Sequence, residues 1–444
     1  MASSTAGSPR ARIAWISPDP TTIAAARPAF AHAGYALFAG SDETAADIAV
    51  VDLRQRRFSL KAAQHLAEEA RRAAPDCGVV YLTSPALTAS ERAHLRRSGE
   101  IVAATQDYDT AIDVCRRRLR LRNIAEESGE RLKSIAATMR LCEFPTISAS
   151  SAPPDVLVAA PPGPMALSLL DAAERVSSRT IGAFNAAQAM RALEAGGIDC
   201  AVLAPQGEGD PMLALARSMR RHARFQDLPV VLIDGDDDFA PKGKGSSNVV
   251  ERLSARCAAE NLPARIVAAS RRARLVSAMR RFLSACAGDG VRDRLSGSFC
   301  PQFFAQHAER LFARSDETGR PIAVVGLRLS SPANQADVGA AMTLTSAAQL
   351  INRVTRAEDF AARLSSDTFV ILQSATQASD AEAAAKRIEG VIANTRFRSH
   401  RDHHPFAVAV ASAASVREPK ARVDETVASI LGRLNNAVAR TAER

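Results

Sequence analysis

Aromatic residues are scarce in this sequence, and long apolar runs are missing from it. Aromatics make up 5% of the 444 residues, with a single Trp, whereas hydrophobic residues make up 47%. The cores must therefore consist mainly of Ala, Val, Leu and Ile. No stretch approaches the roughly 18 consecutive apolar residues that a membrane helix needs, and the opening MASSTAGSPRAR lacks the apolar core of a signal peptide. We expect a cytoplasmic protein with no membrane insertion.

Cysteine is also sparse, and its positions follow no pattern. Seven cysteines are scattered along the chain, an odd number without any C-x-x-C pair. This usage argues against a disulfide framework and a zinc site, and we expect no metal. The net charge of +9 admits nucleic acid, anionic lipid or a phosphorylated small molecule as a partner. The Arg-rich segments have the spacing of amphipathic helices and no accompanying DNA-binding motif, so we expect no nucleic-acid partner.

Short apolar segments alternate with amphipathic helical patterns through most of the chain. The strand patterns RIAWIS, ADIAVVDLR and GVVYLTS are separated by helices, which is typical of a parallel sheet covered on both faces. The same rhythm restarts after the Pro/Ser-rich break FPTISASSAPP, with ARIVAA at 264–269 as an expected strand. The pattern predicts two doubly wound (flavodoxin-like) units, at 10–143 with a long C-terminal helix and at 155–288, joined by a linker at 144–154.

The pattern changes in the last part of the chain, residues 289–444. The segment DFAARLSSDTFVILQS predicts two strands in a hairpin with the turn at SSD. Helical patterns precede and follow these strands, and we expect the helices on one side of the sheet. This arrangement is an α+β domain.

The first two units resemble response-regulator receiver domains, and residues 289–444 resemble the diguanylate cyclase (GGDEF) domain, a nucleotide-cyclase-like fold. The entry segment DRLSGSFCPQFF is similar to the family pattern D-x-L-T-G-L-x-N-R-R-x-F. The resemblance implies a Gly-Gly hairpin turn that lets backbone approach a nucleotide, and acids that hold two Mg²⁺.

The turn of this chain departs from the family pattern. Ser365 and Ser366 stand where the glycines are expected, Asp367 keeps the first acid, and Thr368 replaces the second. The metal-binding acid expected at the end of the first strand is replaced by Leu327 or Leu329. We expect a degenerate, non-catalytic domain and no enzyme activity.

The resemblance also implies a product-binding site, R-x-x-D, placed five residues before the turn. Arg356 and Asp359 match this pattern and spacing, and Arg387 falls at the offset of the third member on the next helix. Guanidinium groups can hold guanine edges or phosphates, and a carboxylate can accept from guanine nitrogens. We expect cyclic-di-GMP as the ligand of these three residues. The alternative is a local ion pair between Arg356 and Asp359 at a helix end.

A working receiver domain needs a phosphoacceptor Asp, an acid pair for Mg²⁺ and a Lys after the fifth strand. Asp52 occupies the acceptor place in the first unit, but only Asp19 stands near the metal place, and Ala104 replaces the Lys. The second unit has Ala204 at the acceptor place. Asp52 is therefore a possible phosphoacceptor or a solvated residue at a strand end. The second unit is expected to serve for dimerisation or docking.

Together these patterns predict a cyclic-di-GMP-binding effector that recruits protein partners and forms a homodimer. The resemblance implies cell-cycle control at a cell pole, with an adaptor and a substrate of the ClpXP protease as partners. Two alternatives remain: a receiver-based dimerisation scaffold without the ligand, and a phosphorylation-driven regulator that works through Asp52.

Overall fold

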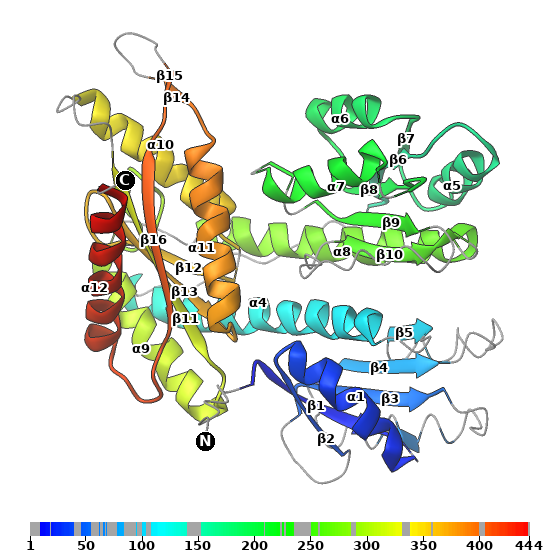
Figure 1. The fold of residues 1–444 in the computed structure, drawn as a ribbon, viewed down its shortest axis with the longest axis horizontal. Coiled ribbons are helices and arrows are strands. Elements are labelled where there is room, and N and C mark those ends of the chain that lie inside the picture. Colours follow the sequence, from blue (N-terminus) through cyan, green and yellow to red (C-terminus); the bar gives the residue numbers. More distant parts are fainter. Residues whose placement is uncertain are drawn as a thin grey trace.

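Three α/β units follow one another along the chain (Figure 1). The computed structural model describes residues 9–17, 19–39, 46–54, 78–83, 100–103, 108–139, 152–207, 209–222, 224–225, 228–234, 250–255, 258–285, 290–330, 338–356, 358–398 and 405–442, with isolated residues between 62 and 95. None of the described helices is long and apolar enough to cross a membrane.

The first unit has a five-stranded parallel sheet of order β2-β1-β3-β4-β5. This is the flavodoxin-like, doubly wound order that the sequence predicts. All six residues of β3 are buried, as expected for a central strand covered on both faces. The elements are β1 (Ala11–Ile16), α1 (Pro20–His32), β2 (Tyr35–Ala39), β3 (Ile48–Leu53), β4 (Gly78–Thr83) and β5 (Glu100–Ala103).

The second unit repeats this topology. Its parallel sheet has the order β7-β6-β8-β9-β10, which is the same order counted from its own first strand. The elements are β6 (Asp155–Ala159), α5 (Pro164–Glu174), β7 (Arg179–Ala183), α6 (Ala186–Ala195), β8 (Cys200–Leu203), α7 (Pro211–Arg221), β9 (Val230–Asp234) and β10 (Val250–Ser254). Residues 144–151 of the expected linker lie outside the described residues.

The strand expected at 264–269 is wrong. These residues lie inside the long helix α8 (Ala258–Ala285), and the edge strand of the sheet is β10 instead. Leu262, Ile266 and Ala269 are buried in the core of the second unit at spacings of four and three, which is the period of a helix face. The short apolar run therefore belongs to one face of a helix and not to a strand.

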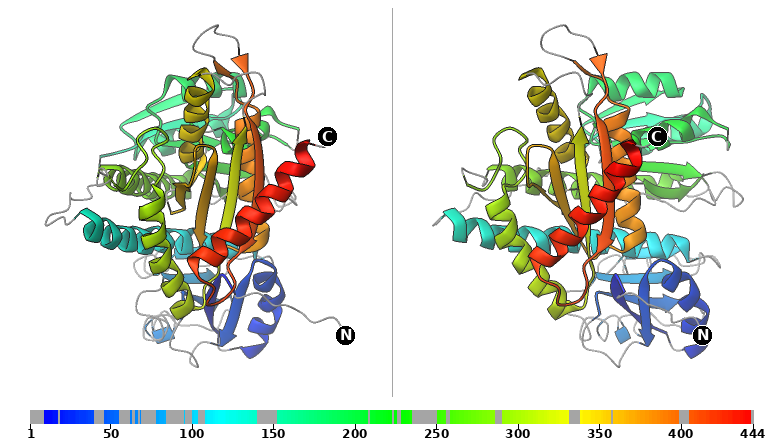
Figure 2. Two further views of the ribbon diagram at one scale, coloured as in Figure 1. Left: turned by 90° about the vertical axis from the view of Figure 1, so that its left-hand side faces the viewer. Right: turned by 60° about the vertical axis from the view of Figure 1, so that its left-hand side comes forward.

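A second long helix, α4 (Asp109–Met139), belongs to two units at once. Its first half buries Ile112, Cys115 and Leu119 in the core of the first unit. Its second half places Ile135, which is fully buried, in a core of the third unit. In Figures 1 and 2, α4 runs beside α8 toward the third unit.

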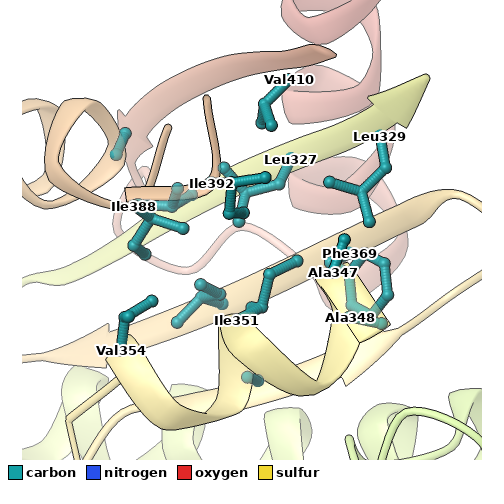
Figure 3. Close-up of a cluster of buried hydrophobic side chains, with 14 of the residues drawn as sticks. Leu327, Leu329, Ala347, Ala348, Ile351, Val354, Phe369, Ile388, Ile392 and Val410 are labelled. Atoms are coloured by element: carbon teal, nitrogen blue, oxygen red, sulfur yellow. The ribbon is translucent and has the colours of Figure 1, made fainter. Parts of the chain in front are cut away.

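The third unit has an antiparallel sheet of order β12-β13-β11-β16. Its helices cover both faces, which corrects the expectation of helices on one side. Helices α10 and α11 pack on one face (Figure 3), and α9, α12 and the end of α4 pack on the other. The elements are α9 (Pro301–Thr318), β11 (Ile322–Ser330), α10 (Val338–Val354), β12 (Phe360–Arg363), β13 (Thr368–Ser374), α11 (Ala378–Ala393), β14 (Phe397–Arg398), β15 (Pro405–Phe406), β16 (Ala409–Val416) and α12 (Val423–Ala442).

Candidate functional site

The predicted R-x-x-D segment is the turn between α10 and β12. The backbone N–H of Asp359 donates to the carbonyl of Arg356 at 3.2 Å, and β12 begins at the next residue. Arg356 is half-buried, whereas Asp359 is buried with 7% of its surface exposed. The turn therefore points one side chain toward the surface and holds the other inside.

Gln373 on β13 holds the carboxylate of Asp359. The strand register pairs Phe360 with Leu372, which places Asp359 opposite Gln373. The Nε2 of Gln373 donates to Oδ2 of Asp359 at 2.9 Å, and both side chains are buried. The sequence analysis missed Gln373, because only the strand register shows that it faces the turn.

Arg387 reaches the same turn from α11. Its Nη2 donates to the carbonyl of Val354, the last residue of α10, at 3.3 Å. Burial raises the pKa of the Asp359 carboxyl above its ordinary value, and the neighbouring Glu358 raises it further. The positive charges of Arg356 and Arg387 act in the opposite direction on this pKa. The structure therefore brings together all three residues that the sequence analysis selected for this site.

The turn is also held by α4. Arg120 donates to Oε1 of the buried Glu358 at 2.7 Å. Burial works against ionisation of Glu358, but Arg120 and Arg356 outweigh it and lower the pKa of this carboxyl. The sequence analysis missed both Arg120 and Glu358, since no local pattern links a residue of the first unit to this turn.

Arg131 makes a second contact between α4 and the turn. Its Nη2 donates to the carbonyl of Asp359 at 3.3 Å, and the guanidinium lies 5.5 Å from the centre of the Phe360 ring. The same group pairs with Glu127 at 2.6 Å, and Oε1 of Glu127 also lies within hydrogen-bond distance, 3.0 Å, of Nε2 of His307 on α9. This buried charged group fixes α4 on the third unit.

The hairpin turn with two serines is closed by Arg363. Its guanidinium donates to the carbonyls of Ser365 at 3.0 Å and Ser366 at 2.7 Å, and to Asp293 of the entry segment at 2.9 Å. Among the described residues other than Gly, only Ala375 and Lys420 have positive φ. Ser365 and Ser366 therefore adopt backbone conformations that do not require glycine.

The acid of this turn, Asp367, is engaged by its neighbours. Its Oδ1 accepts from Ser365 at 2.7 Å and from Thr368 at 2.8 Å. Partial burial opposes ionisation, but these hydrogen bonds lower the pKa of Asp367 below its ordinary value. Arg328 lies 3.9 Å from its other oxygen. A guanidinium thus faces the acid of the turn.

The end of β11 carries no acid toward the turn. Leu327 and Leu329 are buried in the core beneath α10 and α11 (Figure 3), and Arg328 between them pairs with Thr368 in the sheet. Across the described part of the chain, no three His, Cys, Asp or Glu residues are grouped so that they could hold a metal ion.

In the first unit, the carboxylate of Asp52 is bound by its own neighbour. Arg54 donates through Nε to Oδ1 at 2.9 Å and through Nη2 to Oδ2 at 2.6 Å. The same guanidinium donates to the hydroxyl of Tyr108 at 3.2 Å. These bonds raise the pKa of Arg54, with the Asp52 hydrogen bond as the largest cause. Asp52 is 2% exposed and is bonded at both oxygens.

Two of the other residues of the expected receiver chemistry belong to the described part of the chain. Asp19 is the N-cap of α1 and accepts from the backbone of Thr21. Ala204 is buried in the core of the second unit. Ala104 lies outside the described residues.

The fold and the turn define a mixed α and β domain at the C-terminal end of the chain. Residues 292–441 match the family model described as Diguanylate cyclase, GGDEF domain. The chain therefore carries a C-terminal GGDEF domain. No curated protein matches the chain.

Several solved GGDEF structures are similar to part of this chain. The GGDEF domain of DgcB from Caulobacter crescentus, in complex with c-di-GMP, is 19% identical over 35% of this chain and 89% of its own, with a TM-score of 0.32. Diguanylate cyclase SiaD from Pseudomonas aeruginosa, with its activator SiaC, is 16% identical over 37% of this chain and 64% of its own, with a TM-score of 0.32. The FimX GGDEF domain from Pseudomonas aeruginosa is 17% identical over 34% of this chain and 94% of its own, with a TM-score of 0.31.

Proposed function

We propose that this protein is a non-catalytic cyclic-di-GMP-binding effector. Its degenerate GGDEF domain binds the dinucleotide at Arg356, Asp359 and Arg387. The two receiver-like domains form the docking surfaces for protein partners. The observation that carries the proposal is the meeting of these three residues at one turn between α10, β12 and α11.

The chemistry of the three residues suits the ligand. Cyclic-di-GMP offers guanine edges and two phosphates, and a guanidinium can bond guanine O6 and N7 or a phosphate. Arg356 lies at the surface side of the turn, where it can reach such a group. The Asp359 carboxylate can accept from guanine N1 and N2, provided that it is ionised and turns toward the ligand.

The hairpin turn supports the absence of catalysis. Joining two GTP molecules needs metal-binding acids and close approach of the backbone to the nucleotide. Here the carbonyls of Ser365 and Ser366 are bonded to Arg363, and Arg328 places a positive charge beside Asp367. The two arginine side chains therefore lie at the positions in the turn where a nucleotide and its metal ions would have to bind.

The two sheets of flavodoxin-like order support receiver-like domains that no longer accept a phosphate. In the first, the Arg54 guanidinium holds the carboxylate of Asp52 where a metal and a phosphoryl group would have to bind. In the second, Ala204 has no nucleophile. Both domains then act as dimerisation or docking surfaces.

The order of two receiver-like domains and a degenerate GGDEF domain resembles the response regulators PleD and PopA, and the loss of catalytic residues is closer to PopA. This resemblance supports a role in cell-cycle-controlled proteolysis at the cell pole. The partners would be an adaptor and a substrate of the ClpXP protease, bound by a homodimer in the cytoplasm.

The test is isothermal titration of the full chain with cyclic-di-GMP. The wild-type protein is expected to bind saturably, and Arg356→Ala to bind at least about tenfold more weakly. Arg433→Ala is the matched control, because Arg433 is an exposed arginine on α12, on the opposite face of the sheet. Incubation with GTP and Mg²⁺ is expected to yield no cyclic-di-GMP.

Two results would reject the proposal. The first is a lack of binding in the wild type, which leaves a scaffold built from receiver-like domains. The second is equal binding by wild type and Arg356→Ala, which removes the ligand from this turn.

A further inference from the structure

One side chain on an otherwise apolar face of β13 is polar. Phe369 and Ile371 are buried in the core that α10 and α11 cover, and the alternation of a strand places Gln373 on the same face. Gln373 is 1% exposed, and the strand register pairs it with the small Ala323 of β11. A buried amide among apolar neighbours is costly unless it is hydrogen-bonded, so its partner matters.

The partner of this amide is the carboxylate of Asp359. Ala361 of β12 belongs to the same core as Ile371, and the alternation continued back by two residues brings Asp359 to that face. Nε2 of Gln373 donates to Oδ2 of Asp359 at 2.9 Å. The contact engages one oxygen of the carboxylate, and it joins β13 to the turn that carries the candidate ligand residues.

Only half of the amide is used. Within the described part of the chain, Oε1 of Gln373 is buried and accepts no hydrogen bond. An apolar side chain of similar size would fill the same position without leaving a buried acceptor unpaired. What the amide contributes at this position is therefore its N–H donor to Asp359.

The donor acts on a carboxyl that burial disfavours as an anion. Burial raises the pKa of Asp359, and the hydrogen bond from Gln373 acts against this rise. A hydrogen bond to one oxygen also limits rotation of the carboxylate. The charged groups around Asp359 are Arg356 and Glu358 of its own turn, Arg387 of α11, and Arg120 and Arg131 of α4, which bond Glu358 and the carbonyl of Asp359.

We propose that Gln373 is a positioning residue of the dinucleotide site. Its amide anchors Oδ2 of Asp359 and holds the carboxylate ionised, with Oδ1 turned to accept from a guanine edge of cyclic-di-GMP. This inference rests on the proposed function and assigns to the same site a residue of β13 that acts through Asp359 and not by touching the ligand.

The experiment must separate positioning of Asp359 from packing of the sheet. Gln373→Leu removes the donor and keeps a side chain of similar volume, and Gln373→Met is a second variant that keeps the unbranched shape. Gln349→Leu is the matched control, because Gln349 is an exposed glutamine of α10 whose amide donates to the carbonyl of Leu295. Melting temperatures identify the variants that are folded.

Isothermal titration of the full chain with cyclic-di-GMP at several pH values gives the readout. At about pH 7 we expect Gln373→Leu to bind about tenfold more weakly than the wild type, which is the loss of one charge-assisted hydrogen bond. Without the donor Asp359 ionises at higher pH, so the loss should shrink as the pH rises. Gln349→Leu is expected to bind as the wild type does.

A double-mutant cycle tests whether Gln373 acts through Asp359. Asp359→Asn removes the carboxylate, so adding Gln373→Leu to this variant should change the affinity little. If the two substitutions instead lower the affinity by independent factors that multiply, Gln373 does not work through Asp359 and the inference is wrong.

The outcomes separate this inference from the proposed function. If the wild type does not bind the dinucleotide, the proposed function fails and this inference fails with it. If the wild type binds and the folded Gln373 variants bind equally well, the inference alone is overturned. Weakening by the same factor at every pH also overturns it, since that result is expected from altered packing.

Discussion

Arg120 and Glu358 are 238 residues apart in the chain and 2.7 Å apart in the structure. Arg120 lies on a helix that begins in the first unit, and Glu358 lies inside the turn that carries the candidate ligand residues. The pair is largely buried, and Arg131 on the same helix bonds the next residue of the turn, Asp359. The position of α4 and the shape of the turn are therefore linked by direct contacts.

The first prediction concerns this pair. Arg120→Ala leaves Glu358 buried without the cation of α4 that pairs with it. We expect this change to lower the free energy of unfolding by about 2–3 kcal/mol, because it weakens the contact between α4 and the GGDEF domain. Glu358→Gln removes the charge and is expected to cost less. Thermal unfolding of both single variants and the double variant checks this as a double-mutant cycle. Losses that simply add in the double variant would show that the two side chains do not interact.

The second prediction follows from the raised pKa of Asp359 in the folded protein. A carboxyl that holds its proton more tightly when folded stabilises the protein below its unfolded pKa of about 3.9, and this contribution is lost as the pH rises through the folded pKa. The ligand-free wild type is expected to lose stability relative to Asp359→Asn as the pH rises from about 3.9 through the raised pKa of the folded protein. Melting temperatures of both proteins across this range measure the difference. A difference that does not change with pH would contradict the raised pKa.

The third prediction concerns the ligand and has the opposite sign. Asp359 must be ionised to accept from guanine, so binding of cyclic-di-GMP should tighten as the pH rises through the raised pKa. Below that pKa, affinity is expected to fall by up to about tenfold for each pH unit. Titrations at several pH values give the profile, and Asp359→Asn should bind weakly with a flatter profile. If binding tightens on acidification instead, Asp359 does not act as an acceptor.

The fourth prediction concerns Asp52. Because Arg54 binds both carboxylate oxygens, acetyl phosphate with Mg²⁺ is expected to leave the protein unlabelled. Intact-protein mass spectrometry detects the added phosphoryl group, and an active receiver domain treated in parallel shows that the reagent works. A mass increase that disappears in Asp52→Asn would establish a phosphorylation-driven regulator.

The fifth prediction tests the packing of α4. Ile135 is fully buried among side chains of the GGDEF domain, and Ile135→Ala is expected to cost about 2–4 kcal/mol. The loss should appear as faster hydrogen exchange in the second half of α4 and in α9. Lys133→Ala, two residues earlier and exposed, should leave both helices unchanged.

Central strands were the most predictable part of the fold. The apolar run at Ile48–Leu53 is buried along its whole length, and such runs stand out in a sequence. The edge strands β2 and β7 were missed, because many of their residues are partly or fully exposed, so neither strand forms a continuous apolar run. The expected strand at 264–269 failed for a related reason: a short apolar run has the same composition in a strand and on a helix face.

The residues of the candidate site also fall into two groups, those that local spacing predicts and those that only tertiary contacts reveal. The sequence could group Arg356, Asp359 and Arg387, because their spacing from the hairpin turn follows the order of elements within one domain; their role in binding stays a prediction. Gln373 and Arg120 were missed, since each reaches the turn through tertiary contacts that no local spacing encodes. Arg54 stands two residues from Asp52, but only the structure shows that it closes on the carboxylate.

The 31 residues of α4 form one helix about 46 Å long. Its first and second halves are buried in two separate hydrophobic cores. The GGDEF match begins at residue 292. The hydrophobic core that α9 covers nevertheless includes Ile135, which lies far upstream in the sequence. In topological terms, the second unit is an insertion between a helix and the domain that this helix completes. Evolution could exchange that insertion while the helix kept its place on α9, whereas a GGDEF domain cut away from α4 would expose part of its own interior to water.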